Sequence, residues 1–251
     1  MNTQARKPKG TPVGGQFDGQ HRAESTCQLE DVTRSVERYP RGKVVAWRNS
    51  NGQLQDPPSG EPAERVFRPD ESVEYEAHYQ AGKIQDPPSG EPAERHFFQD
   101  GSLLREIHYQ AGQRQDPLPG EPALHCFYPD GSLEQEDHYQ AGELQDPPSG
   151  EPAERRLRPD GSLLFEVHYQ AGKMQDPPSG EPAQCVYRPD GSVEYERHYQ
   201  ASKLQDPPSG EPAEREFSPD GSVRYAEHYQ AGEPVFVVPP ILDVPDWFYL
   251  S

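Results

Sequence analysis

A fixed period of 30 residues runs through most of this 251-residue chain and limits what it can fold into. The tripeptide His-Tyr-Gln begins at His78, His108, His138, His168, His198 and His228, and Gly-Glu-Pro-Ala begins at Gly60, Gly90, Gly120, Gly150, Gly180 and Gly210. A period in this range indicates a repeat array, in which each unit buries apolar surface only against its neighbours.

The composition taken alone is typical of a disordered chain. Leu, Ile, Val and Phe make up 41 residues, and 43 acidic against 24 basic residues give a formal net charge of −19. Few apolar residues and a high net charge are the usual signature of disorder. A thin sheet of stacked units needs a smaller core than a globule, so the period reconciles the composition with a folded array. No stretch approaches the roughly 20 apolar residues of a membrane-spanning helix.

Each unit has the pattern of a β-hairpin. Two short alternating segments flank the turn sequence Pro-Asp-Gly-Ser, as at 129–132, in which Pro and Gly suit the turn. Glu71 replaces this Gly in the first copy and should strain the turn or loosen it. Gln-Ala-Gly supplies a second turn, and Asp-Pro-Pro-Ser-Gly predicts an exposed loop because consecutive prolines remove strand donors. We therefore predict an all-β array of antiparallel hairpins, an elongated twisted sheet of about twelve strands at two per unit, either a flat meander or a coiled one.

The chain divides into three predicted parts. Residues 1–34 form a basic, Gly-, Thr- and Gln-rich leader that we expect to be disordered. Residues 35–232 hold one degenerate copy and the six regular copies, the degenerate copy being the cap that an exposed sheet edge requires. Residues 233–251 are the most apolar stretch and contain Trp247 and Phe248. They are predicted to be a closing strand over the last hairpin or a docking and self-association tail.

The repeated pattern resembles a known family. An aromatic residue, an Asp-Gly turn, a strand and then Glu-x-His-Tyr with a following Gly-Lys is similar to the MORN repeat, and more closely to the MORN-variant repeats of bacterial antitoxin or immunity-type proteins. The resemblance covers about residues 35–232, and the Asp-Pro-Pro-Ser-Gly-Glu-Pro insertion lengthens the unit to 30 residues. It implies a hairpin sheet with a protein-binding role and carries over no catalytic residue.

The six histidines suggest a metal ladder only at first sight. With two strands per unit, successive histidines lie roughly 10 Å apart, whereas zinc requires its ligands near 2 Å from one centre. In the structural interpretation, the glutamates that lie two residues before the histidines, such as Glu76 before His78, share a face with them and pair with them across strands, while Tyr79 closes the other face. We expect no metal, no cofactor and no catalytic residue, because six copies of one site would be a strange design for an enzyme.

The three cysteines, Cys27, Cys126 and Cys185, do not form a disulfide framework. Cys126 and Cys185 are one residue short of two full periods apart, which places them on opposite faces and two units apart. The pattern fits a reducing cytoplasm.

Positions that differ between copies are the candidate partner-binding residues. In every copy the residues equivalent to Val73 and Tyr79 stay apolar or aromatic, whereas the position of Tyr75 between them varies. Because side chains alternate between the two faces along a strand, we predict that all three positions lie on one face. The candidates are Tyr75, Arg105, Gln135, Phe165, Tyr195 and Tyr225, with Trp247 and Phe248 of the tail; alongside run Ala77, Ile107, Asp137, Val167, Arg197 and Glu227. Neutral drift after duplication is the competing interpretation.

Two functions remain open from the sequence. The first is a non-enzymatic binding protein that captures a basic protein, since a charge of −19 accelerates association with such a partner. The second is a structural array whose C-terminal tail self-associates. We expect no direct binding of nucleic acid. Lipid binding ranks last because anionic membranes attract basic segments, and this array is acidic.

Overall fold

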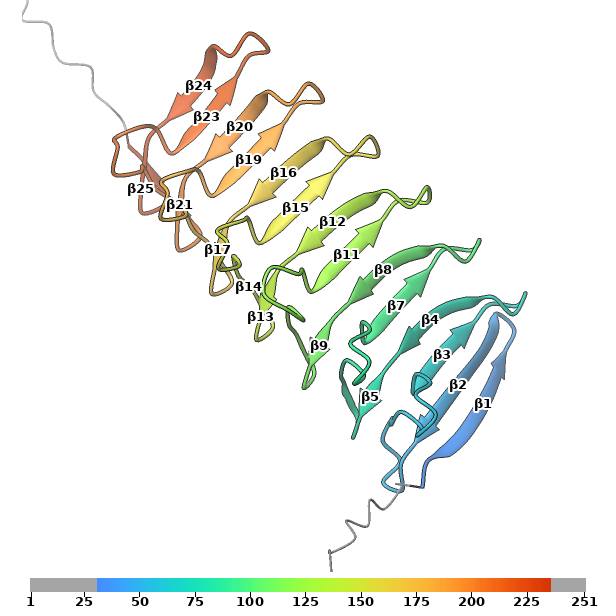
Figure 1. Ribbon diagram of the computed structural model, residues 1–251. Coiled ribbons are helices and arrows are strands. Elements are labelled where there is room, and N and C mark those ends of the chain that lie inside the picture. Colours follow the sequence, from blue (N-terminus) through green and yellow to red (C-terminus); the bar gives the residue numbers. More distant parts are fainter. Residues whose placement is uncertain (1–30, 236–251) are drawn as a thin grey trace, which may run out of the picture.

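The computed structural model describes residues 31–235, and over this range the chain is a ladder of antiparallel hairpins with no helix. Figure 1 shows the hairpins stacked side by side, with residues 31 and 235 at opposite ends of the array. The predictions for residues 1–30 and 236–251, including Trp247 and Phe248, lie outside the described residues. The described residues contain no helix of the length and apolarity that crossing a membrane requires.

One sheet of fourteen strands runs through the molecule, and its strands lie in sequence order. Every neighbour pair is antiparallel, so the sheet is an open meander. The strands are β1 (Thr33–Tyr39), β2 (Gly42–Arg48), β3 (Glu64–Phe67), β4 (Val73–Ala77), β7 (Glu94–Phe97), β8 (Leu103–Ile107), β11 (Leu124–Phe127), β12 (Leu133–Asp137), β15 (Glu154–Leu157), β16 (Leu163–Val167), β19 (Gln184–Tyr187), β20 (Val193–Arg197), β23 (Glu214–Phe217) and β24 (Val223–Glu227).

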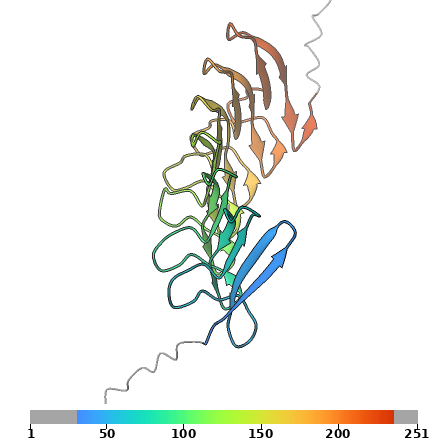
Figure 2. The ribbon, with the colours of Figure 1, turned by 90° about the vertical axis from the view of Figure 1, so that its right-hand side faces the viewer.

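The prediction of an array of antiparallel hairpins is confirmed, and each regular unit contributes two strands to this sheet. Figures 1 and 2 show that the sheet twists along its length. The degenerate copy supplies β1 and β2, and β1 starts at Thr33, two residues before the predicted start of the array. That copy has the longest strands, seven residues each, because its hairpin has no bulge.

Each unit also contains a second, much shorter hairpin that the sequence predicted only as a turn. These two-stranded ladders are β5 (Tyr79–Gln80) with β6 (Lys83–Ile84), β9 (Tyr109–Gln110) with β10 (Gln113–Arg114), β13 (Tyr139–Gln140) with β14 (Glu143–Leu144), β17 (Tyr169–Gln170) with β18 (Lys173–Met174), β21 (Tyr199–Gln200) with β22 (Lys203–Leu204), and β25 (Tyr229–Gln230) with β26 (Glu233–Pro234). Successive short hairpins are joined by single backbone bonds, such as Gly112 N–H to the Ile84 carbonyl at 2.9 Å.

The turns follow the local chemistry of their residues. In the first unit the Arg68 amide donates to the Ser72 carbonyl at 2.9 Å, and the Asp70 carboxylate accepts the Ser72 amide at 3.0 Å. The turn needs a positive φ at the third residue of Pro-Asp-Gly-Ser, and Glu71 adopts φ 69° where the other copies have Gly. A side chain in this region is strained, as the sequence predicted.

The core is thin and made of small side chains. The six alanines of the Gly-Glu-Pro-Ala motif are completely buried: Ala63, Ala93, Ala123, Ala153, Ala183 and Ala213. Among larger side chains only Ile107 is buried to the same degree within residues 31–235. Such a core explains how an array can form with so few large apolar residues, and it means that polar contacts have to hold the units together.

Candidate protein-binding surface

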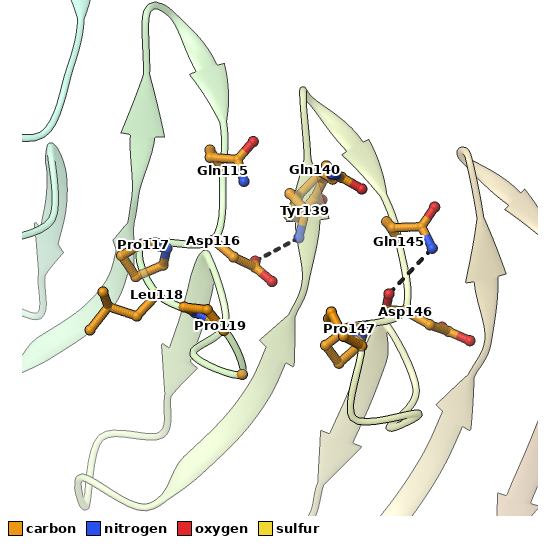
Figure 3. Close-up of a pocket in the computed structure, with 12 residues that line it drawn as sticks. Gln115, Asp116, Pro117, Leu118, Pro119, Tyr139, Gln140, Gln145, Asp146 and Pro147 are labelled. Carbon is orange, nitrogen blue, oxygen red and sulfur yellow. Dashed lines mark hydrogen bonds between the residues drawn. The ribbon is translucent and has the colours of Figure 1, made fainter.

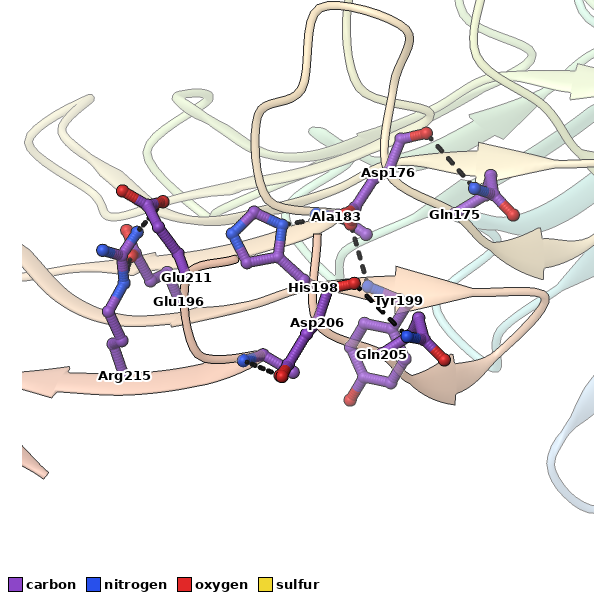
Figure 4. Close-up of polar contacts among 11 residues, drawn as sticks. Gln175, Asp176, Ala183, Glu196, His198, Tyr199, Gln205, Asp206, Glu211 and Arg215 are labelled. Carbon is purple, nitrogen blue, oxygen red and sulfur yellow. Dashed lines mark hydrogen bonds and ion pairs between the residues drawn. The ribbon is translucent and has the colours of Figure 1, made fainter. Parts of the chain in front are cut away.

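The junction between units is held by an Asp–His pair that recurs in all six copies, with the histidine buried in the first five. In the fifth copy, one carboxylate oxygen of Asp176 accepts the backbone amides of Ala183 at 2.9 Å and Tyr199 at 2.8 Å. The other oxygen lies 2.8 Å from His198 Nδ1, and His198 is only 2% exposed. Figure 4 shows this network, in which the loop aspartate joins two backbone segments and one imidazole. The histidines are therefore structural.

The predicted pairing of glutamates with these histidines across strands is wrong. His78 pairs with Asp56, 22 residues earlier, whereas Glu76 lies on the sheet and binds Arg65 at 3.0 Å. The partner was missed because the Asp-Pro-Pro-Ser-Gly loop was considered only as a breaker of strands. Its aspartate recurs with the same 30-residue period as the histidine, and this coincidence was the signal that could have found the pair.

One face of the sheet carries similar side chains in most copies; we call it the constant face. Its first row crosses the sheet with alternating charge, following the register Arg65, Glu76, Arg95, Glu106, His125, Glu136, Arg155, Glu166, Cys185, Glu196, Arg215 and Ala226. Ion pairs join neighbours in this row, for example Arg155 to Glu136 at 2.6 Å. Figure 4 shows Arg215 between Glu196 and Glu211.

A second row of the constant face is apolar. It pairs Phe67 with Val73, Phe97 with Leu103, Phe127 with Leu133, Leu157 with Leu163, Tyr187 with Val193, and Phe217 with Val223. Contacts within this face confirm the grouping of the two rows: the Arg215 guanidinium lies 5.9 Å from the Phe217 ring centroid, and the Tyr187 hydroxyl donates to Glu166. Burial raises the pKa of the Cys185 thiol on this face to about 12.

A β-bulge in every regular hairpin corrects the predicted position of the frame residue Val73. The register passes from Val66 opposite Tyr75 to Phe67 opposite Val73, so that one residue is extra. Residues directly opposite each other share a face, which puts Val73 with Phe67 on the constant face and Tyr75 on the other. The period-2 rule failed here because it assumes an unbroken strand.

The opposite surface, which we call the variable face, holds the predicted partner-binding residues. Its central row follows the register Val66, Tyr75, His96, Arg105, Cys126, Gln135, Arg156, Phe165, Val186, Tyr195, Glu216 and Tyr225. The structure thus brings all six described candidates into one row with an equally variable set from the neighbouring strands. Cys126 lies here and Cys185 on the constant face, as predicted, and both are free thiols.

Neighbouring side chains partly engage the candidates. The Tyr75 and His96 rings lie 4.8 Å apart, and Arg105 donates to Glu94 at 3.2 Å while its side chain stays 40% exposed. The Arg156 guanidinium lies 5.6 Å from the Phe165 ring. Burial raises the pKa of Tyr75 above its usual range. The row is therefore preorganised and half accessible, which suits recognition by fixed side chains.

Acidic groups border this row. The next row contains Glu64, Glu94, Asp137, Glu154, Glu214 and Glu227. Asp137 is 4% exposed, and burial, opposed by the Gln135 hydrogen bond, raises its pKa to about 6. Other copies have different residues at the position of Asp137. Ala77, Ile107 and Val167 are buried apolar residues, while Arg197 binds Glu214 at 2.9 Å.

Open grooves recur between successive loops. The one in Figure 3 has a volume of 530 Å³ and is lined by Asp116, Leu118, Tyr139, Asp146 and Pro147 among others. Equivalent grooves of 520 and 550 Å³ lie at 55–88 and 175–208. Figure 2 shows the loops aligned along one side of the array. Among the described residues no group of three or more His, Cys, Asp or Glu side chains is arranged to hold a metal ion.

Comparison with known proteins agrees with this architecture. Residues 126–141, from the end of β11 through the turn to the start of the following short hairpin, match the family described as MORN repeat variant. No curated protein matches the sequence. The matched unit, together with the repeated strand and hairpin pattern, supports a MORN-variant repeat protein, a module suited to binding or scaffolding.

Proposed function

We propose that this chain is a non-enzymatic binding module that captures a basic protein on the variable face, in the manner of an antitoxin or immunity protein of the cytoplasm. The observation that carries the proposal is the contrast between the two faces. Residues that join the units recur in most copies, whereas one continuous, half-exposed row varies: its second-strand position is Tyr in three copies and Arg, Gln or Phe in the others, and its first-strand position holds five residue types.

Two further observations support a basic protein partner. The variable row contains aromatic and arginine side chains, which dominate the energetics of protein interfaces. The carboxylates beside the row, within a chain of net charge −19, attract a positive partner and speed its association. Neither observation favours an anionic membrane or nucleic acid as the ligand.

The test starts with capture of the partner from lysate of the host by the tagged full-length chain. Near-stoichiometric recovery of one basic protein, weakened by moderate salt, is expected. Affinity is then measured for Arg105→Tyr and Phe165→Tyr, which install a residue found at this position in other copies. Loss of at least tenfold in the double variant is expected.

The controls are Leu103→Val and Leu163→Val, on the same two strands but on the constant face. Val occupies this position in other copies, so both controls should fold and bind normally. Recovery of the bait alone, migrating as an oligomer through its C-terminal tail, would support the structural array instead. Equal effects of the two pairs would also contradict a role for the variable face.

A further inference from the structure

The two edge strands of the sheet, β1 and β24, expose apolar side chains and carry residues that differ from those at the inner junctions. Of the six large apolar side chains exposed in residues 31–235, four lie on the terminal strands: Val36 and Tyr39 on β1, and Val223 and Tyr225 on β24. From these edges we infer that copies of this chain associate head to tail, with β24 of one copy pairing antiparallel with β1 of the next. This inference is independent of the proposed partner capture.

The direction of the strands permits this continuation. Fourteen antiparallel strands in sequence order make β1 and β24 point in opposite directions, so a second copy placed beyond β24 continues the meander. Inside the array, Tyr195, Glu196 and Arg197 pair with the strand that follows. Ser35 of β1 and Glu64 of β3 both lie opposite Ala46, on either side of β2, so Ser35 is the β1 residue equivalent to Glu64. With the inner register, β24 of one copy would therefore pair with β1 of the next as Tyr225 with Glu37, Ala226 with Val36, and Glu227 with Ser35.

Backbone groups match at the same place. At the inner junctions an amide donates to the following strand, as His198 N–H does to the Ala213 carbonyl at 2.7 Å. The equivalent amide of His228 has no backbone acceptor among the described residues. The Trp47 amide donates to Ala63, on the side of β2 away from β1. Arg34, which lies opposite Trp47, therefore has its backbone N–H and C=O pointing outward from the sheet. Its carbonyl is available to the His228 amide of another copy.

The side chains at the two edges depart from the pattern together. The alternating row of the constant face has Glu in five of the six regular second strands and Ala226 in the last. The β1 residue that would lie opposite is Val36, where inner strands most often have Arg. A glutamate at 226 would have no basic partner across such a junction, whereas alanine and valine suit each other.

Charge selects this arrangement over pairing of like edges. Residues 33–48 contain five basic side chains and one acidic, while the last unit, 206–235, contains two basic and seven acidic. Two β1 edges or two β24 edges would bring like charges together, and only the mixed pair joins opposite charges. The junction lacks the loop and the Asp–His pair of the inner junctions, so we expect association only at high protein concentration.

The test is sedimentation equilibrium of the purified full-length chain at rising concentration. The wild-type mass should rise without levelling off, because a head-to-tail contact does not close on itself. Ala226→Glu, which installs the residue of the other five copies, should lower the association constant about tenfold. Val36→Arg combined with Ala226→Glu recreates the inner Arg–Glu pair and should restore it.

Leu118→Pro is the matched control, since it removes an exposed apolar residue away from both edges and installs the residue of the other loops. It should leave the mass unchanged. A monomer at every concentration would overturn the inference. A mass that stops at twice the monomer, or an association insensitive to Ala226→Glu, would overturn it as well.

Discussion

The constant and variable faces share the same strands, yet they differ in how much their residues change between copies. On the constant face Arg stands opposite Glu in three of the six regular units, and Phe stands opposite an aliphatic residue in four. On the variable face the equivalent pairs range from Val66 with Tyr75 to Arg156 with Phe165. The junctions of this array therefore depend on polar and apolar contacts from one side and from the loops, which leaves the other side open to variation.

Removing one loop aspartate should have the largest effect. In Asp146→Ala the amides of Ala153 and Tyr169 and the imidazole of His168 lose a shared acceptor, with distances of 2.9, 2.8 and 2.7 Å in the intact chain. Leaving buried donors unpaired costs about 1–3 kcal/mol each, so we expect a loss of about 4 kcal/mol. Urea unfolding followed by hydrogen exchange should locate the loss at this junction. The exposed turn variant Asp160→Ala should change little, and equal effects would deny the Asp–His pair its role.

Asp137 offers a stabilising change on the variable face. Its pKa of about 6 in the folded chain, against 3.8 for an ordinary aspartate, means that the folded state binds more protons between these values. Stability therefore falls as pH rises from about 4 to 6, by up to ~3 kcal/mol. Asp137→Val, with the residue found at 167, should raise the free energy of unfolding by this order at pH 7, and the gain should disappear below pH 4. A gain independent of pH would show that packing, not ionisation, is responsible.

Neighbouring arginines on β15 compare the two faces directly. Arg155→Ala removes the partner of Glu136 from the constant face, and we expect a loss of about 1 kcal/mol in thermal or urea unfolding. Arg156→Ala, one residue later on the variable face, removes the contact with the Phe165 ring and a positive charge near Asp137, and should cost less than about 0.5 kcal/mol. Affinity for the partner should show the reverse order: Arg156→Ala should weaken binding more than Arg155→Ala. Equal stability losses would contradict the assignment of stability to the constant face and of binding to the variable face.

A small stabilising effect is expected at the strained turn. Glu71→Gly installs the residue of the other five turns at φ 69°, and relief of strain should add about 0.5–1 kcal/mol to the free energy of unfolding, less the contribution of the Lys43–Glu71 pair. Differential scanning calorimetry is sensitive enough to detect it. Gly101→Glu is the reciprocal variant and should destabilise by a similar amount.

Much of the architecture could be predicted from the period and the turn residues. Pro-Asp-Gly-Ser and Gln-Ala-Gly mark their turns by local chemistry, and a repeated local rule yields the whole ladder. The bulge could not be predicted in this way, since nothing in residues 72–75 distinguishes an extra residue from a regular alternation. Position 73 was consequently assigned to the wrong face.

The site was predicted in part for a related reason. The six candidates from Tyr75 to Tyr225 were found because they vary, and variation is visible in a repeated sequence. Their cross-strand neighbours, such as His96 and Arg156, depend on the pairing between hairpins, which the sequence does not specify residue by residue. The Asp–His pair was missed because 22 residues and two turns separate its members.

The direction of the strands has a mechanical consequence. The strands lie across the long axis of the array, so a force applied between residues 31 and 235 acts along the backbone bonds that join neighbouring strands and opens them one after another. Each released unit of 30 residues would lengthen the chain by about 90 Å, the difference between a contour of roughly 100 Å and a folded thickness of about 10 Å. Under tension the protein should therefore behave as an extensible tether that yields in equal steps at low force and shortens again, hairpin by hairpin, when the load is removed.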